Sequence, residues 1–253
     1  MTILNKIVNL ATNRLSLDAS GERDLVESAL RRLPGVVYRR LHEQGFLPGG
    51  IVDIGAYEGN WTRTIRNIFP APPILMVEAR KEQEPILQQV CSDLRGVKCA
   101  ISLLGRGPIA SVPFHVSGTG SSIFAERSDA PKALQHMAMQ TLDDVVSKWG
   151  AQFSSLFLKL DIQGAELECL RGGGATLLKT EVIQLEVALL NYNEGAPQAA
   201  EVIAFMDGQG FAMFDIGGYV RPNGVNLVQL DIIFARKNSR LRPDYFHYHP
   251  AGS

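Results

Sequence analysis

The segment IVDIGAYEGN, residues 51–60, decides the fold of this 253-residue chain. An apolar strand pattern that ends in Asp53 runs into a turn with glycines at positions 55 and 59, and a helix pattern begins at Asn60. Glycine allows the backbone to approach a ligand closely, and a helix N-terminus presents unpaired N–H groups. The order of strand, acidic residue, glycine turn and helix therefore predicts a pocket for a nucleoside cofactor.

The alternation of strand and helix patterns continues along the chain. Further strand patterns occupy residues 74–78, 97–101, 155–161 and 181–188, and helix patterns occupy residues 61–69, 82–90, 142–149, 165–170 and 199–209. Strands that alternate with helices in this way indicate a parallel sheet. The pattern changes at residues 111–116, which alternate like an antiparallel or edge strand, and at residues 211–216 and 228–235, which are expected to form a closing pair of strands.

The composition is that of a soluble α/β domain. Hydrophobic residues make up 45%, charged residues 20%, and the formal net charge is −1, so neither nucleic acid nor an anionic membrane surface is an expected partner. No apolar run reaches the ~18 residues that span a bilayer, and we expect no stable membrane insertion. Three cysteines without CxxC spacing argue against disulfides and a zinc site, and favour the reducing cytoplasm.

Acidic residues stand at or near the ends of four strand patterns: Asp53, Glu78, Asp161 and Glu186. Open parallel sheets bind ligands at the carboxyl ends of their strands. A lone acid there is most simply a surface carboxylate, but four beside a glycine turn favour a site. Glu78 follows Gly55 by 23 residues, which is where a carboxylate holds the ribose hydroxyls of NAD or of S-adenosylmethionine.

The spacing within the turn distinguishes these two cofactors. NAD sites use G-x-G-x-x-G, because a pyrophosphate rests on the helix N-terminus. Here the pattern is D-x-G-x-x-x-G, with Glu58 inside the turn. A carboxylate there would repel a pyrophosphate, whereas it suits the cationic sulfonium and amino group of S-adenosylmethionine. The turn favours the methyl donor, and an NAD-dependent oxidoreductase remains the alternative.

With these motifs in place, the chain resembles the FkbM family of S-adenosylmethionine-dependent methyltransferases over roughly residues 48–236. The segments that carry the resemblance, in the family's order, are IVDIGAYEGNWTRTI (51–65), ILMVEA (74–79), VKCAIS (97–102), GTGSSIF (118–124), TLDDVV (141–146), LFLKLDIQGAELECLRGG (156–173) and VIQLEVALLNYNEG (182–195). The most specific piece is K-x-D-x-x-G-x-E, which begins at Lys159. Tyr57 departs from the family, whose members often carry Asn there.

The resemblance implies a fold and a set of donor-binding residues. We expect a Rossmann-like α/β domain with a seven-stranded, mostly parallel sheet whose last strand is antiparallel, and helices on both faces. The implied donor contacts are Asp53, Gly55, Ala56 and Glu58 at the methionine part, Glu78 at the ribose, Ala100, Ile101 and Ser102 beside the adenine, Asp161 near the methyl or amino group, and Ser122, with Ser121, in a closing loop.

Three side chains are candidates for the base that receives the acceptor's proton: Asp161, Glu186 and His115. Lys159 shares a strand face with Asp161, and it either forms a structural ion pair or fixes that acid. Asp161 and Glu186 would hold a divalent metal only with a third ligand, and the sequence offers no clear one beyond Asn191. We therefore expect no metal site.

The sequence as a whole predicts a cytoplasmic, bacterial-type O-methyltransferase. The expected acceptor is a hydroxyl of a sugar, a glycolipid or another secondary metabolite. A helical extension at 1–47 would cover the acceptor side or form a homodimer contact, and residues 237–253 form a polar tail. A non-catalytic protein that keeps the donor-binding fold is a second alternative.

Overall fold

A computed structural model describes residues 33–127, 133–150, 153–222 and 224–243. Most of the expected N-terminal extension and the end of the polar tail, with His247 and His249, lie outside the described residues. Within them, α3 (Leu33–Glu43) belongs to the expected extension. It packs on the domain, because its Tyr38 hydroxyl donates a 2.6 Å hydrogen bond to Gln184 of the central sheet.

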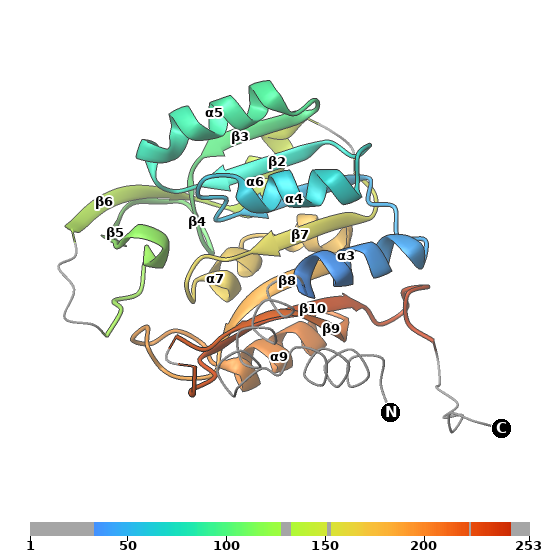
Figure 1. Cartoon of the computed structure of the whole chain (residues 1–253). Helices are drawn as coiled ribbons and strands as arrows, with labels where there is room; N and C mark the ends of the chain where they lie inside the picture. Colours follow the sequence, from blue (N-terminus) through green and yellow to red (C-terminus); the bar gives the residue numbers. More distant parts are fainter. Residues whose placement is uncertain (1–32, 128–132, 151–152, 223, 244–253) are drawn as a thin grey trace, which may run out of the picture.

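The centre of the molecule is a seven-stranded sheet with the order β3-β2-β1-β7-β8-β10-β9 (Figure 1). Its strands are β1 (Gly50–Ile54), β2 (Ile74–Glu78), β3 (Val97–Ile101), β7 (Leu156–Leu160), β8 (Thr180–Ala188), β9 (Phe211–Val220) and β10 (Gln229–Arg236). Strands β3, β2, β1, β7 and β8 are parallel, and β10 runs antiparallel to both of its neighbours. This confirms the mostly parallel sheet with an antiparallel last strand.

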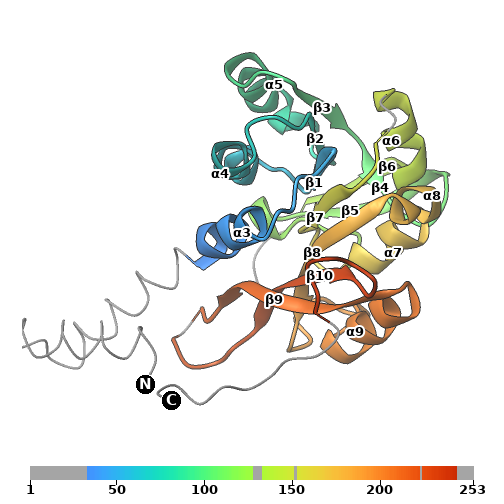
Figure 2. The same ribbon diagram turned by 90° about the vertical axis from the view of Figure 1, so that its right-hand side faces the viewer.

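Helices cover both faces of this sheet, as Figure 2 shows. Helices α3, α4 (Asn60–Ile68) and α5 (Glu84–Asp93) lie on one face, with the short 3₁₀ turn η1 (Lys81–Gln83) before α5. Helices α6 (Leu142–Trp149), α7 (Glu166–Arg171), α8 (Gly174–Leu178) and α9 (Ala199–Gly208) lie on the other. Each face has its own apolar core, so the Rossmann-like α/β arrangement is confirmed.

Local sequence explains the element boundaries. All residues of β1, β2 and β7 are buried, which is why these central strands appear as continuous apolar runs rather than alternating ones. Helix α6 begins after Thr141, whose side chain accepts a hydrogen bond from the Asp144 N–H, and ends at Gly150 in the left-handed conformation. Helix α8 was not expected, because the helix pattern read from the sequence ends at residue 170 and glycines follow it at 172–174.

A second, three-stranded sheet stands between β3 and α6 in the chain and has the order β4-β6-β5. Its strands are β4 (Leu103–Leu104), β5 (Ile109–Val116) and β6 (Ala133–Gln140). The expected strand at 111–116 is β5, which pairs antiparallel with β6. The 3₁₀ turn η2 (Gly118–Gly120) follows β5. None of the helices in the described part of the chain is long and apolar enough to cross a membrane.

Candidate functional site

A cavity of about 470 Å³ opens where β1, β2, β7 and β8 end. Its wall consists of residues 54–58, 77–80 and 102–104, together with parts of 118–123 and of 161–165. Single residues from other elements complete it: Asn60 and Trp61 of α4, Phe114 of β5, Lys159, Glu186, Val220 and Gln229. This volume is within the usual range of ~300–1,000 Å³ for small-molecule sites. The cavity is at the carboxyl edge of the parallel sheet, where ligands bind in folds of this kind.

The glycine turn after β1 owes its sequence to backbone packing. Gly55 has φ +75°, and a Cβ atom there would stand 2.0 Å from the carbonyl oxygen of Asp161. Gly59 also has φ +75°, and its Cβ would stand 2.9 Å from Val90 of α5. Side chains at these positions would be strained by conformation and by contact. The two glycines therefore let β1 approach β7, and α4 approach α5, which shapes the cavity.

Tyr57 occupies a left-handed conformation in the same turn, with φ +49°. Asparagine tolerates this region better than other non-glycine residues, so a tyrosine here carries a backbone cost that asparagine would reduce. The Tyr57 ring lies 5.7 Å from the guanidinium carbon of Arg80, and both side chains line the cavity. This cation–π contact closes one side of the wall.

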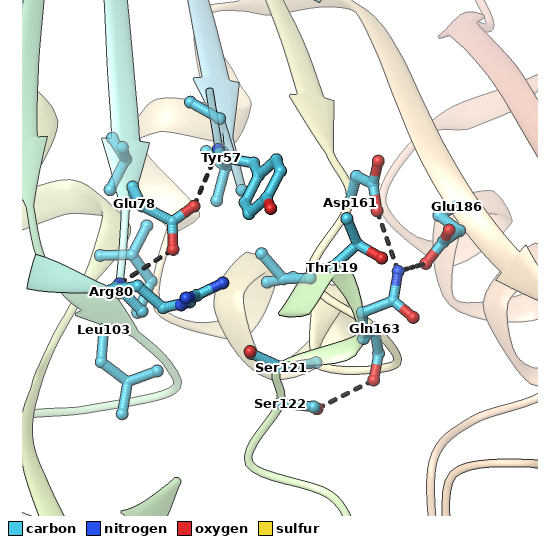
Figure 3. A pocket seen from close by; sticks show the side chains of 18 of the residues that line it. Tyr57, Glu78, Arg80, Leu103, Thr119, Ser121, Ser122, Asp161, Gln163 and Glu186 are labelled. Carbon is cyan, nitrogen blue, oxygen red and sulfur yellow. Dashed lines mark hydrogen bonds between the residues drawn. The ribbon is translucent and has the colours of Figure 1, made fainter. Parts of the chain in front are cut away.

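Glu78 is held at the end of β2 by backbone N–H groups. Its Oε2 accepts a hydrogen bond from the Tyr57 N–H and its Oε1 accepts one from the Arg80 N–H, each 2.9 Å long. The residue is 7% exposed and lines the cavity. Because a carboxylate oxygen has two acceptor positions, each oxygen of Glu78 can accept a further bond from a ligand hydroxyl (Figure 3).

Asp53 lies behind this wall and does not line the cavity. It is fully buried, accepts a 2.7 Å hydrogen bond from the Thr62 hydroxyl, and has its Oδ1 3.2 Å from the Lys159 Nζ. Lys159 also donates a 3.1 Å hydrogen bond to the Gly55 carbonyl oxygen. Burial lowers the pKa of Lys159, but Asp53 and Asp161 outweigh it and hold that pKa above its ordinary value. A charged lysine therefore ties β1 to β7 beneath the turn.

Two acids face each other at the opposite end of the cavity, across one glutamine (Figure 3). The Gln163 Nε2 donates to Asp161 Oδ1 at 3.1 Å and to Glu186 Oε2 at 2.6 Å. The Asp161 side chain is 41% exposed and its Oδ2 lies 3.5 Å from the Lys159 Nζ. Glu186 is 7% exposed. The two carboxylates thus differ in exposure and in charged partners.

A second amide fixes the other side of Glu186. The Gln229 Nε2 donates a hydrogen bond to Glu186 Oε1, and the Tyr192 hydroxyl donates a 3.1 Å bond to the Gln229 Oε1. Because its oxygen is occupied by Tyr192, the Gln229 amide presents N–H to the acid. Glu186 is therefore bonded to an amide on each oxygen.

Burial sets the acid–base character of this end. Burial, and then the charges of Asp161 and Glu166, raise the pKa of Glu186 well above its ordinary value. Burial and Asp161 raise the pKa of Asp231, the neighbour of Glu186 on β10, to about 6. Burial raises the pKa of Glu166 to about 7, although its carboxylate accepts bonds from the Ile162 and Gly164 N–H groups. A proton is therefore easily held in this cluster.

The loop after β5 passes over the cavity and is fixed at both ends. The Ser122 hydroxyl donates a 2.9 Å bond to the Gln163 carbonyl oxygen, which also accepts a 2.8 Å bond from Asn193 Nδ2. At the other end, Arg80 Nη1 donates a 2.9 Å bond to the Gly118 carbonyl oxygen. Ser121 and Ser122 both line the cavity, so the loop connects its two ends.

The structure brings together most, but not all, of the candidate residues. Those that line the cavity are Gly55, Ala56, Glu58, Glu78, Ser122, Asp161 and Glu186. Those outside its lining are Asp53, Ala100, Ile101 and His115. Of the residues expected beside the adenine, Ser102 does line the cavity, together with Leu103 and Leu104. His115 follows Phe114, which does line the cavity, and successive side chains of a strand point to opposite faces.

Two functional candidates escaped the sequence analysis. Gln163 lies inside the segment that carries the family resemblance, between Asp161 and Glu166 in the sequence. That position could have identified it as a candidate site residue. Gln229 has no such signal, because it reaches Glu186 only through the antiparallel pairing of β10 with β8. As for metals, the described ranges contain no group of three or more His, Cys, Asp or Glu side chains that could hold an ion.

Solved structures that are similar to this chain include methyltransferase FkbM from Methylobacillus flagellatus KT, which is 14% identical with a TM-score of 0.46 over 72% of this chain and 43% of that one. EvdMO1 is 14% identical with a TM-score of 0.46, and the match covers 80% of this chain and 41% of EvdMO1. Magnesium protoporphyrin IX methyltransferase from Synechocystis PCC 6803, with bound SAM, is 11% identical with a TM-score of 0.47 over 85% and 83%. This chain therefore spans about two fifths of the length of the first two.

Sequence comparison gives the family. No curated protein matches the chain significantly. The model of the methyltransferase FkbM domain matches residues 53–213, which include the end of β1, the Glu78 carboxylate, the loop after β5 and both acids at the far end of the cavity. The chain belongs to the FkbM methyltransferase family.

Proposed function

We propose that this protein is an S-adenosylmethionine-dependent O-methyltransferase that acts on a hydroxyl of a sugar, a glycolipid or another secondary metabolite. One observation carries the proposal. In a chain of a methyltransferase family, a single cavity joins a carboxylate suited to ribose, Glu78, to a pair of acids, Asp161 and Glu186.

The Glu78 end fits the nucleoside of the donor. Both Glu78 oxygens accept backbone bonds and keep an acceptor position for a ribose hydroxyl, and Ser102 and Leu103 line the cavity where the adenine would lie. Residues 55–58 would flank the methionine part, with the Glu58 carboxylate facing its cationic groups. When bound, S-adenosylmethionine supplies a methyl group on a positively charged sulfur, so the protein mainly has to align the acceptor.

The opposite end suits a hydroxyl acceptor. In O-methylation the carbon–oxygen bond forms as the carbon–sulfur bond breaks, the sulfur keeps the electron pair, and the hydroxyl loses its proton. Asp161 and Glu186 offer carboxylates for that proton, and the amides of Gln163 and Gln229 can bond to further hydroxyls of the acceptor. We expect a small molecule or glycan rather than nucleic acid, because the net charge is −1. The three free thiols are compatible with work in the cytoplasm.

A methyl-transfer assay tests this proposal, with donor labelled on the methyl group and a panel of hydroxylated sugars, glycolipids and polyketide-type alcohols. The expected product carries the label as an ether that resists mild alkaline hydrolysis. Label that alkali releases would indicate a methyl ester and would contradict transfer to a hydroxyl. Binding of NAD without S-adenosylmethionine would favour the oxidoreductase alternative, and donor binding without any product would favour the non-catalytic one.

A further inference from the structure

We propose that Glu186 is the catalytic base and that binding of the cationic methyl donor expels the proton that Glu186 holds in the free protein. The inference rests on the proposed function and extends it, because it names the base and says how the base is prepared.

Asp161 and His115 are the weaker candidates. The Asp161 side chain is 41% exposed, and its Oδ2 lies 3.5 Å from the ammonium of Lys159, so this acid is open to solvent and already paired with a cation. His115 does not line the cavity. Glu186 lines the cavity, is 7% exposed and has no cation within ion-pair distance among the described residues. Of the three, it is therefore the best placed to take a proton from an acceptor in the cavity.

Glu186 is held in place by groups that tolerate both of its protonation states. The amides of Gln163 and Gln229 donate one bond to each carboxylate oxygen, and each oxygen keeps an acceptor position or a proton. Tyr192 orients the Gln229 amide through its own hydroxyl. Gln163, Gln229 and Tyr192 are thus positioning residues, which hold the acid while leaving its proton free to move.

The charges that face Glu186 make its protonation sensitive to an added cation. Asp161 faces it from the end of β7, Glu166 from α7 and Asp231 from β10, while Lys159 of β7 is the cation that acts on it and is shared with Asp53 and Asp161. Tyr192, just after β8, is the remaining titratable neighbour. A positive charge near such a buried acid shifts its protonation equilibrium more than tenfold.

Proton and charge then balance over one turnover. Donor binding adds one positive charge at the sulfur, and Glu186 releases one proton to solvent. Methyl transfer removes that positive charge and frees the hydroxyl proton, which Glu186 takes up. The net charge of the cluster with its ligand is therefore the same before and after transfer, and the next donor molecule expels the proton again.

Calorimetric titration of the full chain with S-adenosylmethionine tests this without knowledge of the acceptor. Titrations at one neutral pH in phosphate and in Tris, whose ionisation enthalpies differ, give the number of protons released. We expect a release approaching about one proton per donor bound, and less with S-adenosylhomocysteine, which lacks the sulfonium charge. Glu186→Gln should abolish the release, while the matched control Glu181→Gln, on the same strand but away from the cavity, should retain it.

The outcomes separate the two proposals. No binding of S-adenosylmethionine would overturn the proposed function, and the inference with it. Binding with the same enthalpy in both buffers would overturn the inference alone. Release that persists in Glu186→Gln would assign the proton to another acid, and equal release with S-adenosylhomocysteine would exclude the sulfonium charge as its cause. If Glu186→Gln does not fold, the comparison of the two ligands on the wild-type protein still decides whether the sulfonium charge expels a proton.

Discussion

The two ends of the cavity are built in different ways. At the β2 end, both oxygens of Glu78 accept hydrogen bonds from backbone N–H groups. At the far end, Asp161 and Glu186 are bonded to the side-chain amides of Gln163 and Gln229. Backbone donors are fixed by the path of the chain, whereas side-chain donors change with a single substitution.

The difference predicts where a substitution should disturb the fold and where it should not. The β2 end depends on turn geometry, which Gly55 and Lys159 secure beneath the surface. The far end depends on residues from β8, β10 and two loops, which can vary without disturbing the turn. Substitutions at the first end should therefore damage folding or donor binding, and substitutions at the second should alter protonation and acceptor choice.

The largest effect is expected from Gly55→Ala. The new Cβ would stand 2.0 Å from the Asp161 carbonyl oxygen at φ +75°, so strain and overpacking together should cost about 3–5 kcal/mol of unfolding free energy. Gly96→Ala is the matched control, since Gly96 has φ +74° and no atom within 4 Å of its Cβ position, and should cost only about 1–2 kcal/mol. Equal losses in urea unfolding would show that the contact with β7 does not matter.

The pH dependence of stability should be dominated by the buried acids at the far end of the cavity. Burial raises the pKa of Glu166 from 4.5 to about 7, so the folded state binds more protons than the unfolded state between these values. Stability should then fall as pH rises from about 4.5 to about 7, by on the order of 3 kcal/mol from this group.

Glu166→Gln keeps an oxygen that can accept from the Ile162 N–H and should flatten this profile, as measured by urea unfolding at a series of pH values. The exposed Glu82→Gln should leave the profile unchanged. A profile that is equally steep in Glu166→Gln would assign the titration to a different group.

The smallest effect is expected in the loop that joins the two ends. Ser122→Ala removes the hydroxyl that donates to the Gln163 carbonyl oxygen and accepts from the Phe124 N–H, at a cost of about 1–2 kcal/mol in thermal unfolding. Ser121→Ala, whose hydroxyl bonds only within its own loop, should cost less. The reverse order would mean that the loop is not held by the turn after β7.

Much of the fold could be predicted because its central strands are continuous apolar runs with an acid at or near their ends. Strand β6 (Ala133–Gln140) was missed, since its sequence, ALQHMAMQ, lacks the β-branched residues that mark strands and most of its residues are exposed. Its partner β5 was recognisable because Val112, Phe114 and Val116 alternate with other residues.

The site was only partly predictable, for a similar reason. Glu78 stands at a fixed distance after the glycine turn, so a pattern can find it. Asp53 follows the same logic but points into the protein toward Thr62 and Lys159, and side-chain direction at a strand end depends on tertiary packing. Gln229 joins the site through the pairing of distant strands, which no local pattern reveals.

The most direct test of the account is a calorimetric titration of S-adenosylmethionine into the wild-type protein and into Glu78→Gln. The glutamine has one acceptor oxygen in place of two and no charge, so the account predicts that donor affinity falls by roughly 10–100-fold, the loss of charge-assisted hydrogen bonds worth ~1.5–3 kcal/mol. The exposed Glu82→Gln should bind like the wild type. Wild-type affinity in Glu78→Gln would contradict the assignment of the β2 end of the cavity to the donor.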